Sequence, residues 1–172
     1  MAGDDSAVVR GAQVDDGRPV AQLIHLYRSG PEHLRELVSD MTREQLSERP
    51  VPGKMSTMEV VCHVVDADQF LADRMKRTIA TDKPLLLGVN GTLYLEALHY
   101  HERDLQLQLS LADVTRWQMA EDLDRLEDIA WSREAVHSES GLVTLRQLLW
   151  HAIRHLERHG DAIAEKRTAL GL

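Results

Sequence analysis

The sequence of 172 residues is short of cysteine: it contains only Cys62. One thiol cannot form an intramolecular disulfide, and it cannot supply the several thiolates of a cysteine-based structural zinc site. Chains that work in oxidising compartments commonly use disulfides. The cysteine content therefore predicts a reducing, cytoplasmic location.

The sequence also lacks long apolar runs and an excess of basic residues. No stretch approaches the ~20 apolar residues of a membrane span, and the first 19 residues contain four aspartates and no apolar core of a signal peptide. Acidic residues outnumber basic ones by 28 to 20, for a net charge of −8. This balance argues against a nucleic-acid partner. We expect residues 1–18 to be a flexible tail and residues 19–172 to be one domain, with no membrane contact.

Aromatic residues are scarce, at three Trp, three Tyr and one Phe, although 43% of the chain is hydrophobic. A core of Leu, Val, Ala and Met favours helices over sheets. Apolar residues recur at helical spacing in four segments, and no strand signal of any length is found. We predict an all-α four-helix bundle. The predicted helices cover residues 20–40, 56–79, 93–126 and 144–167.

Local signals refine these helices. Capping boxes at Ser56–Glu59 and Thr144–Gln147 open the second and fourth helices. Gly30-Pro31 predicts a kink in the first helix or two abutting helices. The third segment would be about 50 Å long if it were straight, so we expect a break near residues 110–113. Its expected inner face consists of Leu95, Leu98, Leu105, Leu109, Val114, Trp117, Met119, Leu123 and Leu126.

Histidine, in contrast, is abundant, with nine residues. His151, His155 and His159 follow one another at intervals of four residues on the fourth helix. Adjacent members can bind one ion, but the outer two are ~12 Å apart along the helix. A helical wheel places His155 and His159 closest to the apolar face and His151 nearest to solvent. An inward histidine can also be an ordinary hydrogen-bonded core residue, so spacing alone leaves both roles open.

A metal site in a bundle needs a further ligand from a facing helix. His63 shares the inner face of the second helix with Val60, Ala67 and Phe70. Three imidazoles would leave coordination positions open, which is the pattern of catalytic zinc sites. Asp66, one turn from His63, is a candidate to orient its ring. Among other candidates, His137 is a loop residue that could lie at a pocket mouth, and Cys62 is expected to be a buried, inert thiol.

The order and spacing of these motifs resemble the DinB-like, or YfiT-like, superfamily over about residues 20–168. One matching segment is Pro52-Gly53-Lys54-Met55-Ser56, in which Met55 replaces the usual tryptophan, followed by Glu59 to His63. The other runs through Gly141, Thr144-Leu145, His155, His159, Ile163 and Arg167.

The resemblance implies an antiparallel-type four-helix bundle whose metal is held by His63, His155 and His159. An alternative alignment would use His151 and His155 in place of the last two. Family members include metal-dependent hydrolases and S-transferases that use low-molecular-weight bacterial thiols. Their ions include nickel and zinc, which we expect first, and iron or manganese.

We therefore predict a divalent-metal-binding protein, expected to be an enzyme that acts on a small molecule, with a bacterial thiol as one candidate, and to form a homodimer. The first alternative is a non-catalytic metal-binding or stress-response protein. The second is a helical dimerisation module whose histidines are merely packed.

Overall fold

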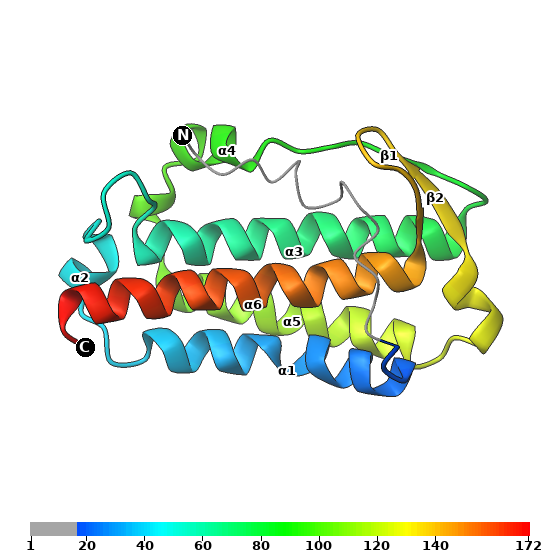
Figure 1. The fold of residues 1–172 in the computed structure, drawn as a ribbon, viewed down its shortest axis with the longest axis horizontal. Helices are drawn as coiled ribbons and strands as arrows, with labels where there is room; N and C mark the ends of the chain where they lie inside the picture. The colour runs from blue at the N-terminus through cyan, green and yellow to red at the C-terminus, as the bar shows by residue number, and fades with distance from the viewer. Residues whose placement is uncertain (1–16) are drawn as a thin grey trace.

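A computed structural model describes residues 17–172, so residues 1–16 of the predicted tail lie outside the described range. Four long helices form a bundle (Figure 1). Each of α1 and α3 packs against both α5 and α6. The sequence prediction of a four-helix bundle is thus confirmed. The four helices are α1 (Val20–Val38), α3 (Thr57–Ala80), α5 (Leu105–Leu123) and α6 (Leu145–Leu170).

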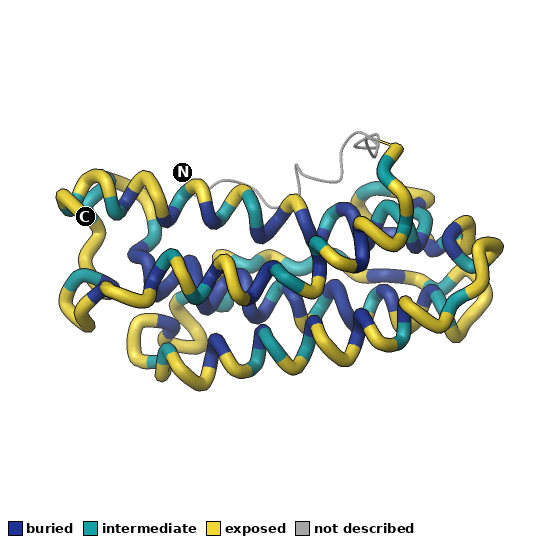
Figure 2. The backbone as a smooth tube through the Cα atoms, turned by 90° about the horizontal axis from the view of Figure 1, so that it is seen from below, coloured by how far each residue is buried: buried dark blue, intermediate teal, exposed yellow. Residues whose placement is uncertain are grey.

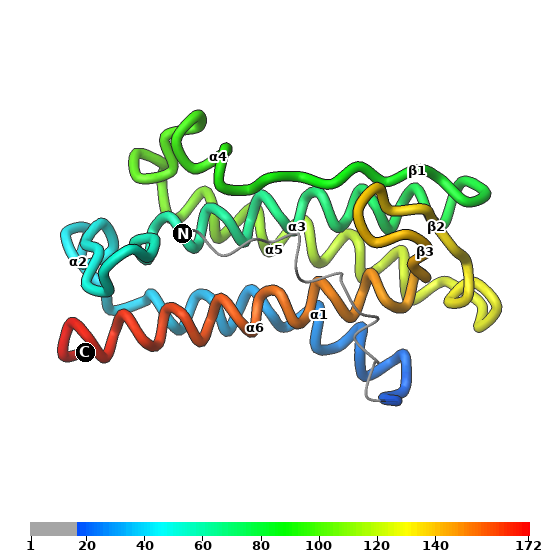
Figure 3. Tube along the Cα trace, turned by 45° about the horizontal axis from the view of Figure 1, so that its top comes forward, coloured from blue at the N-terminus to red at the C-terminus, as the bar shows by residue number. Residues whose placement is uncertain are grey.

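The bundle does not alternate direction with each step around it. α1 and α6 run one way and α3 and α5 run the other way, as the colour gradients in Figures 1 and 3 show. The packed pairs α1–α6 and α3–α5 are consequently parallel, whereas α3–α6 and α1–α5 are antiparallel. The antiparallel arrangement implied by the family resemblance thus holds for two of the four packed pairs.

A small sheet accompanies the helices, although no strand was predicted from the sequence. β1 (Leu85–Leu86) pairs in parallel with β2 (Glu134–His137), and β2 pairs antiparallel with β3 (Gly141–Thr144). The strands are too short to produce a detectable alternation. The sheet lies beside the end of α3 and the start of α6 (Figure 3). His137, expected in a loop, is the last residue of β2.

Side-chain caps fix where two of the long helices begin. Ser56 accepts a hydrogen bond from the backbone of Glu59, whose carboxylate accepts from the Ser56 backbone. Thr144 and Gln147 form the same box at α6. Both predicted helix starts are confirmed. In α1, the helix continues through Gly30 and Pro31 as one element.

The predicted position of the break in the third helical segment was wrong. The chain forms α4 (Gly91–Ala97) and a 3₁₀ turn, η2 (Tyr100–Glu102), and α5 then runs unbroken through residues 110–113. The break falls where His99 adopts a left-handed conformation, with φ of 49°. Asp104 then caps α5 by accepting from the Leu107 backbone.

The buried face of α5 also differs from the prediction. Val114 and Trp117 are 61% and 64% exposed, and Arg116 is buried. Arg116 takes an inward position because Asp68 of α3 binds its guanidinium at two distances of 2.7 Å. A pattern based on apolar residues alone could not identify this face.

Two apolar clusters make up the core, which follows the inner faces of the helices (Figure 2). Trp131 and Trp150 belong to one cluster, and Leu34 and Ile163 belong to the other. The short elements α2 (Arg43–Ser47) and η3 (Asp128–Ser132) lie in the connections between helices. Within residues 17–172, no helix is both long enough and apolar enough to cross a membrane.

Candidate metal centre

Three histidines from two helices meet inside the bundle. His63 lies about two turns into α3, and His155 and His159 lie one turn apart on α6. The ring centroid of His63 is 5.1 Å from that of His155 and 4.7 Å from that of His159, and the last two are 4.5 Å apart. The structure therefore brings together the three histidines that the sequence singled out.

The donor atoms of this histidine cluster suit a metal. Each histidine offers one ring nitrogen such that the three nitrogens lie within 4.8 Å of one another. Imidazole nitrogens bound to one zinc ion at ~2.1 Å would be roughly 3–4 Å apart, so small side-chain rotations would bring them to bonding distance. His63 and His155 are buried, at 7% and 3% exposure. The three residues could hold a divalent ion.

His151 occupies a different place from the cluster. Its ring centroid is 6.1 Å from that of His155, and its side chain lines a pocket next to the cluster. The group of mutually close donors consists of His63, His155 and His159 and does not include His151. The geometry therefore favours the first of the two alignments.

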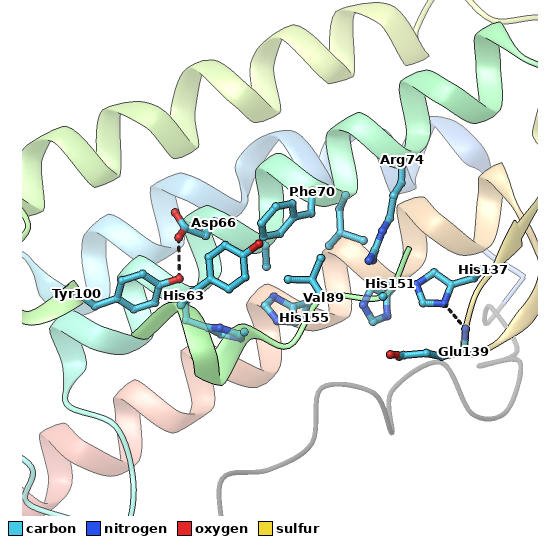
Figure 4. A pocket seen from close by; sticks show the side chains of 15 residues that line it. His63, Asp66, Phe70, Arg74, Val89, Tyr100, His137, Glu139, His151 and His155 are labelled. Carbon is cyan, nitrogen blue, oxygen red and sulfur yellow. Dashed lines mark hydrogen bonds between the residues drawn. The ribbon is translucent and has the colours of Figure 1, made fainter. Parts of the chain in front are cut away.

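A pocket that is partly open to solvent begins at the histidine cluster. The space within it, including the part that is continuous with solvent, is about 610 Å³. His63, Asp66 and Tyr100 lie towards one end, and Arg74, His137, His151 and Glu139 lie towards the other (Figure 4). Phe70 lies between them and contacts the Tyr94 ring edge to face, with centroids 5.5 Å apart.

Asp66 organises the pocket wall beside His63. Its carboxylate accepts a hydrogen bond of 2.6 Å from the Tyr100 hydroxyl and bonds of 2.8 and 3.2 Å from the Arg103 guanidinium. Burial and the neighbouring Asp66 raise the pKa of Tyr100, so its hydroxyl stays protonated. The Asp66 oxygens thus bind Tyr100 and Arg103, and the expected role of Asp66 in orienting the His63 ring stays a prediction.

Cys62 is fully buried next to His63 in sequence, and its thiol donates to the Tyr100 carbonyl at 3.4 Å. Burial raises the pKa of this thiol to about 12. Since a thiolate is the reactive form of cysteine, Cys62 is a poor nucleophile. This agrees with the inert thiol expected from the sequence.

Sequence reasoning missed some residues that line the pocket or bind Asp66. Tyr100 and Arg103 follow the unpredicted break after α4, so their approach to Asp66 could not be foreseen. Arg74 could have been found, because a residue eleven positions after His63 returns to the same face of a helix. His137, a weak candidate in the sequence, does line the pocket.

Comparisons with known proteins agree with this architecture. The family model for the DinB superfamily matches residues 26–163. No curated protein has a significantly similar sequence. The fold resembles YfiT from Bacillus subtilis, described as a probable metal-dependent hydrolase with an unusual four-helix bundle topology. The TM-score is 0.86 at 21% identity, over 92% of this chain and 91% of YfiT.

Two further structures share the fold. A mycothiol-dependent maleylpyruvate isomerase matches with a TM-score of 0.67 and 16% identity over 84% of this chain, which spans only 60% of the isomerase. A DinB-like protein, YjoA, from Bacillus subtilis matches with a TM-score of 0.61 and 19% identity over 88% of this chain and 93% of YjoA. At these low sequence identities, the similarity to the three structures shows a shared fold and no more.

Proposed function

We propose that this chain, which belongs to the DinB superfamily, is a divalent-metal-dependent enzyme that acts on a small molecule. One observation carries the proposal: the three close imidazoles of the histidine cluster adjoin a pocket that opens to solvent. Metal catalysis requires an ion site next to a space that a substrate can enter.

In this proposal His63, His155 and His159 are the metal ligands. Three protein ligands leave coordination positions for water or substrate, unlike a closed structural site. A bound divalent ion would supply Lewis acidity, which activates a water molecule or favours the thiolate form of a thiol. α3 and α6 hold the imidazoles in place, and Tyr100 and Arg103 bind Asp66 in the adjoining wall.

Two chemistries share this site. Resemblance to YfiT, a probable metal-dependent hydrolase, supports hydrolysis. Resemblance to a mycothiol-dependent isomerase supports a reaction that uses a low-molecular-weight thiol, although this chain spans only part of that protein. We propose nickel or zinc as the ion, with iron or manganese next, because a set of three imidazoles accepts several divalent metals.

A non-catalytic metal-binding or stress-response protein is the alternative. Such a protein would need the histidine cluster but not the adjoining pocket. The pocket, lined by His63 and His155 themselves, therefore favours an enzyme. A homodimer and a cytoplasmic location stay predictions from composition.

Turnover by the full-length chain tests the proposal. Protein purified without a histidine tag would be stripped with chelator, reloaded separately with nickel or zinc, and assayed on ester and amide panels and on bacterial thiols with an electrophile. We expect metal-dependent turnover in one panel, lost in His159→Ala and retained in His101→Ala, a matched change at an exposed histidine. Metal-loaded protein that turns over nothing in either panel would favour the non-catalytic alternative.

A further inference from the structure

The end of the pocket opposite the histidine cluster contains an arginine with no acidic partner. Arg74 is half-buried, and Nη2 donates to the Leu87 carbonyl at 2.7 Å. Among residues 17–172, no carboxylate lies within ion-pair distance of its guanidinium, although the neighbouring Asp73 pairs with Arg77 at 2.6 Å. The positive charge of Arg74 thus lines the pocket without a direct ion pair.

Burial disfavours the charged form of Arg74. Burial lowers the pKa of Arg74, and the nearby acids Glu139 and Asp73 partly offset that effect. An arginine side chain nevertheless stays charged in proteins. A partly desolvated cation that lacks a direct ion pair is unfavourable, so an anion that enters the pocket and binds the guanidinium would relieve this cost.

His137 supplies a second donor at the same end. Its Nδ1 accepts from the Glu139 backbone at 3.3 Å, which leaves the ring proton on Nε2. Nε2 is buried and has no hydrogen-bond partner among the described residues. Burial and the Arg74 charge lower the pKa of His137 against the opposing effect of Glu139, so the ring is a neutral donor. His137 itself is 4% exposed.

We propose that Arg74, with His137 beside it, forms a subsite that binds a carboxylate group of the substrate. The inference rests on the proposed function, because it identifies the substrate class for the same pocket. A single cation matches the single charge of a carboxylate, and a guanidinium matches the geometry of its two oxygens. The Leu87 carbonyl fixes the guanidinium in advance, which lowers the cost of binding.

The distance between the histidine cluster and Arg74, at opposite ends of the pocket, limits the size of the substrate. Arg74 lies eleven residues after His63 on the same face of α3, which is ~16 Å along the axis. Helical side chains lean towards the N-terminus, and the side chain of Arg74 is longer than that of His63, so the guanidinium lies closer to the histidine cluster than this axial distance. The substrate is therefore a small carboxylic acid whose reacting group lies several bonds from its carboxylate.

A titration of the full-length, metal-free protein tests the subsite. Propionate and its neutral counterpart propionamide would be added at pH 8 to ¹⁵N-labelled protein, with the backbone amides of Gly88 and Glu139 followed by NMR. We expect saturable shifts with propionate only. Arg74→Gln should weaken propionate binding about tenfold or more, because a charge-assisted hydrogen bond contributes about 1.5–3 kcal/mol. Arg77→Gln, one turn further along α3, should bind like the wild type.

Several outcomes overturn the subsite: equal shifts with propionamide, no saturable shift with propionate, or unchanged binding in Arg74→Gln. If Arg74→Gln does not fold, the comparison of the two ligands in the wild type still decides. The titration uses no metal, so its failure is separate from failure of the proposed function. Metal-dependent turnover without propionate binding refutes the subsite alone, and propionate binding by a protein that takes up no metal refutes the enzyme proposal.

Discussion

Arg116 shows how a single buried charge contributes to this bundle. Its guanidinium binds Asp68 and donates to the carbonyls of Tyr27 and Ala152 at 3.1 and 3.0 Å. Gly30 leaves room for it, since a Cβ at that position would be 2.5 Å from Nη1. Arg116 thereby joins α1, α3, α5 and α6 at one point.

Removing this guanidinium should be strongly destabilising. Arg116→Met would leave the Asp68 carboxylate buried without a counter-charge, and we expect a loss of about 3–5 kcal/mol in the free energy of unfolding. Urea denaturation measures it. Arg125→Met removes an exposed pair with Glu121 and should cost less than about 1 kcal/mol. Equal losses in the two variants would contradict this account of the buried pair.

Some functional and buried polar residues could be predicted from the sequence, and others could not. His155 and His159 could be identified because helix spacing and an apolar stripe fix their direction. Arg74 could have been found, because it shares a face of α3 with His63, but Arg116 could not, because an arginine within a helix is normally assigned to solvent. Only the facing carboxylate of Asp68 shows why Arg116 lies inside. This observation depends on contacts between segments that are distant in the sequence.

Side-chain hydrogen bonds stabilise the first turn of α3. Ser56 is buried, and its reciprocal bonds with Glu59 satisfy two backbone donors there. Arg49 also pairs with the Glu59 carboxylate. This turn fixes the start of the helix that carries His63.

Loss of this cap should be measurable. We expect Ser56→Ala to reduce the free energy of unfolding by about 1–2 kcal/mol, because a buried backbone donor loses its acceptor. Thr42→Ala removes the equivalent cap of the exposed five-residue helix α2 and should cost less. Chemical denaturation compares the two variants, and an equal or larger effect of Thr42→Ala would be inconsistent with this explanation.

At the same scale, helix starts were more predictable than breaks. A capping box is a local sequence signal, and both predicted boxes formed. The break after Leu98 depends on the left-handed conformation of His99 and on the Asp104 cap, while apolar residues continue at helical spacing across it. β1 and β2 pair over 51 positions of sequence, a contact that no local pattern encodes.

For the molecule as a whole, the proposed ion would connect α3 to α6. A ligand that binds only the folded state stabilises it by about 2.7 kcal/mol at a hundredfold excess over Kd. For a chain of this size we expect the melting temperature to rise by about 5–10 °C on adding zinc or nickel to stripped protein. Circular dichroism during heating measures it.

The rise should be absent in His159→Ala and present in His151→Ala, provided that both variants fold. A rise of the same size in His159→Ala would show that the added ion acts elsewhere on the surface.

The metal content of the untagged protein tests the central claim most directly. Elemental analysis of the wild type, His63→Ala, His155→Ala, His159→Ala and His151→Ala would report moles of metal per mole of chain. The account predicts about one divalent ion per chain in the wild type and in His151→Ala, and a near-complete loss in the other three variants. A wild type that neither contains metal nor takes up added nickel or zinc, or a His159→Ala variant that keeps its ion, would contradict it.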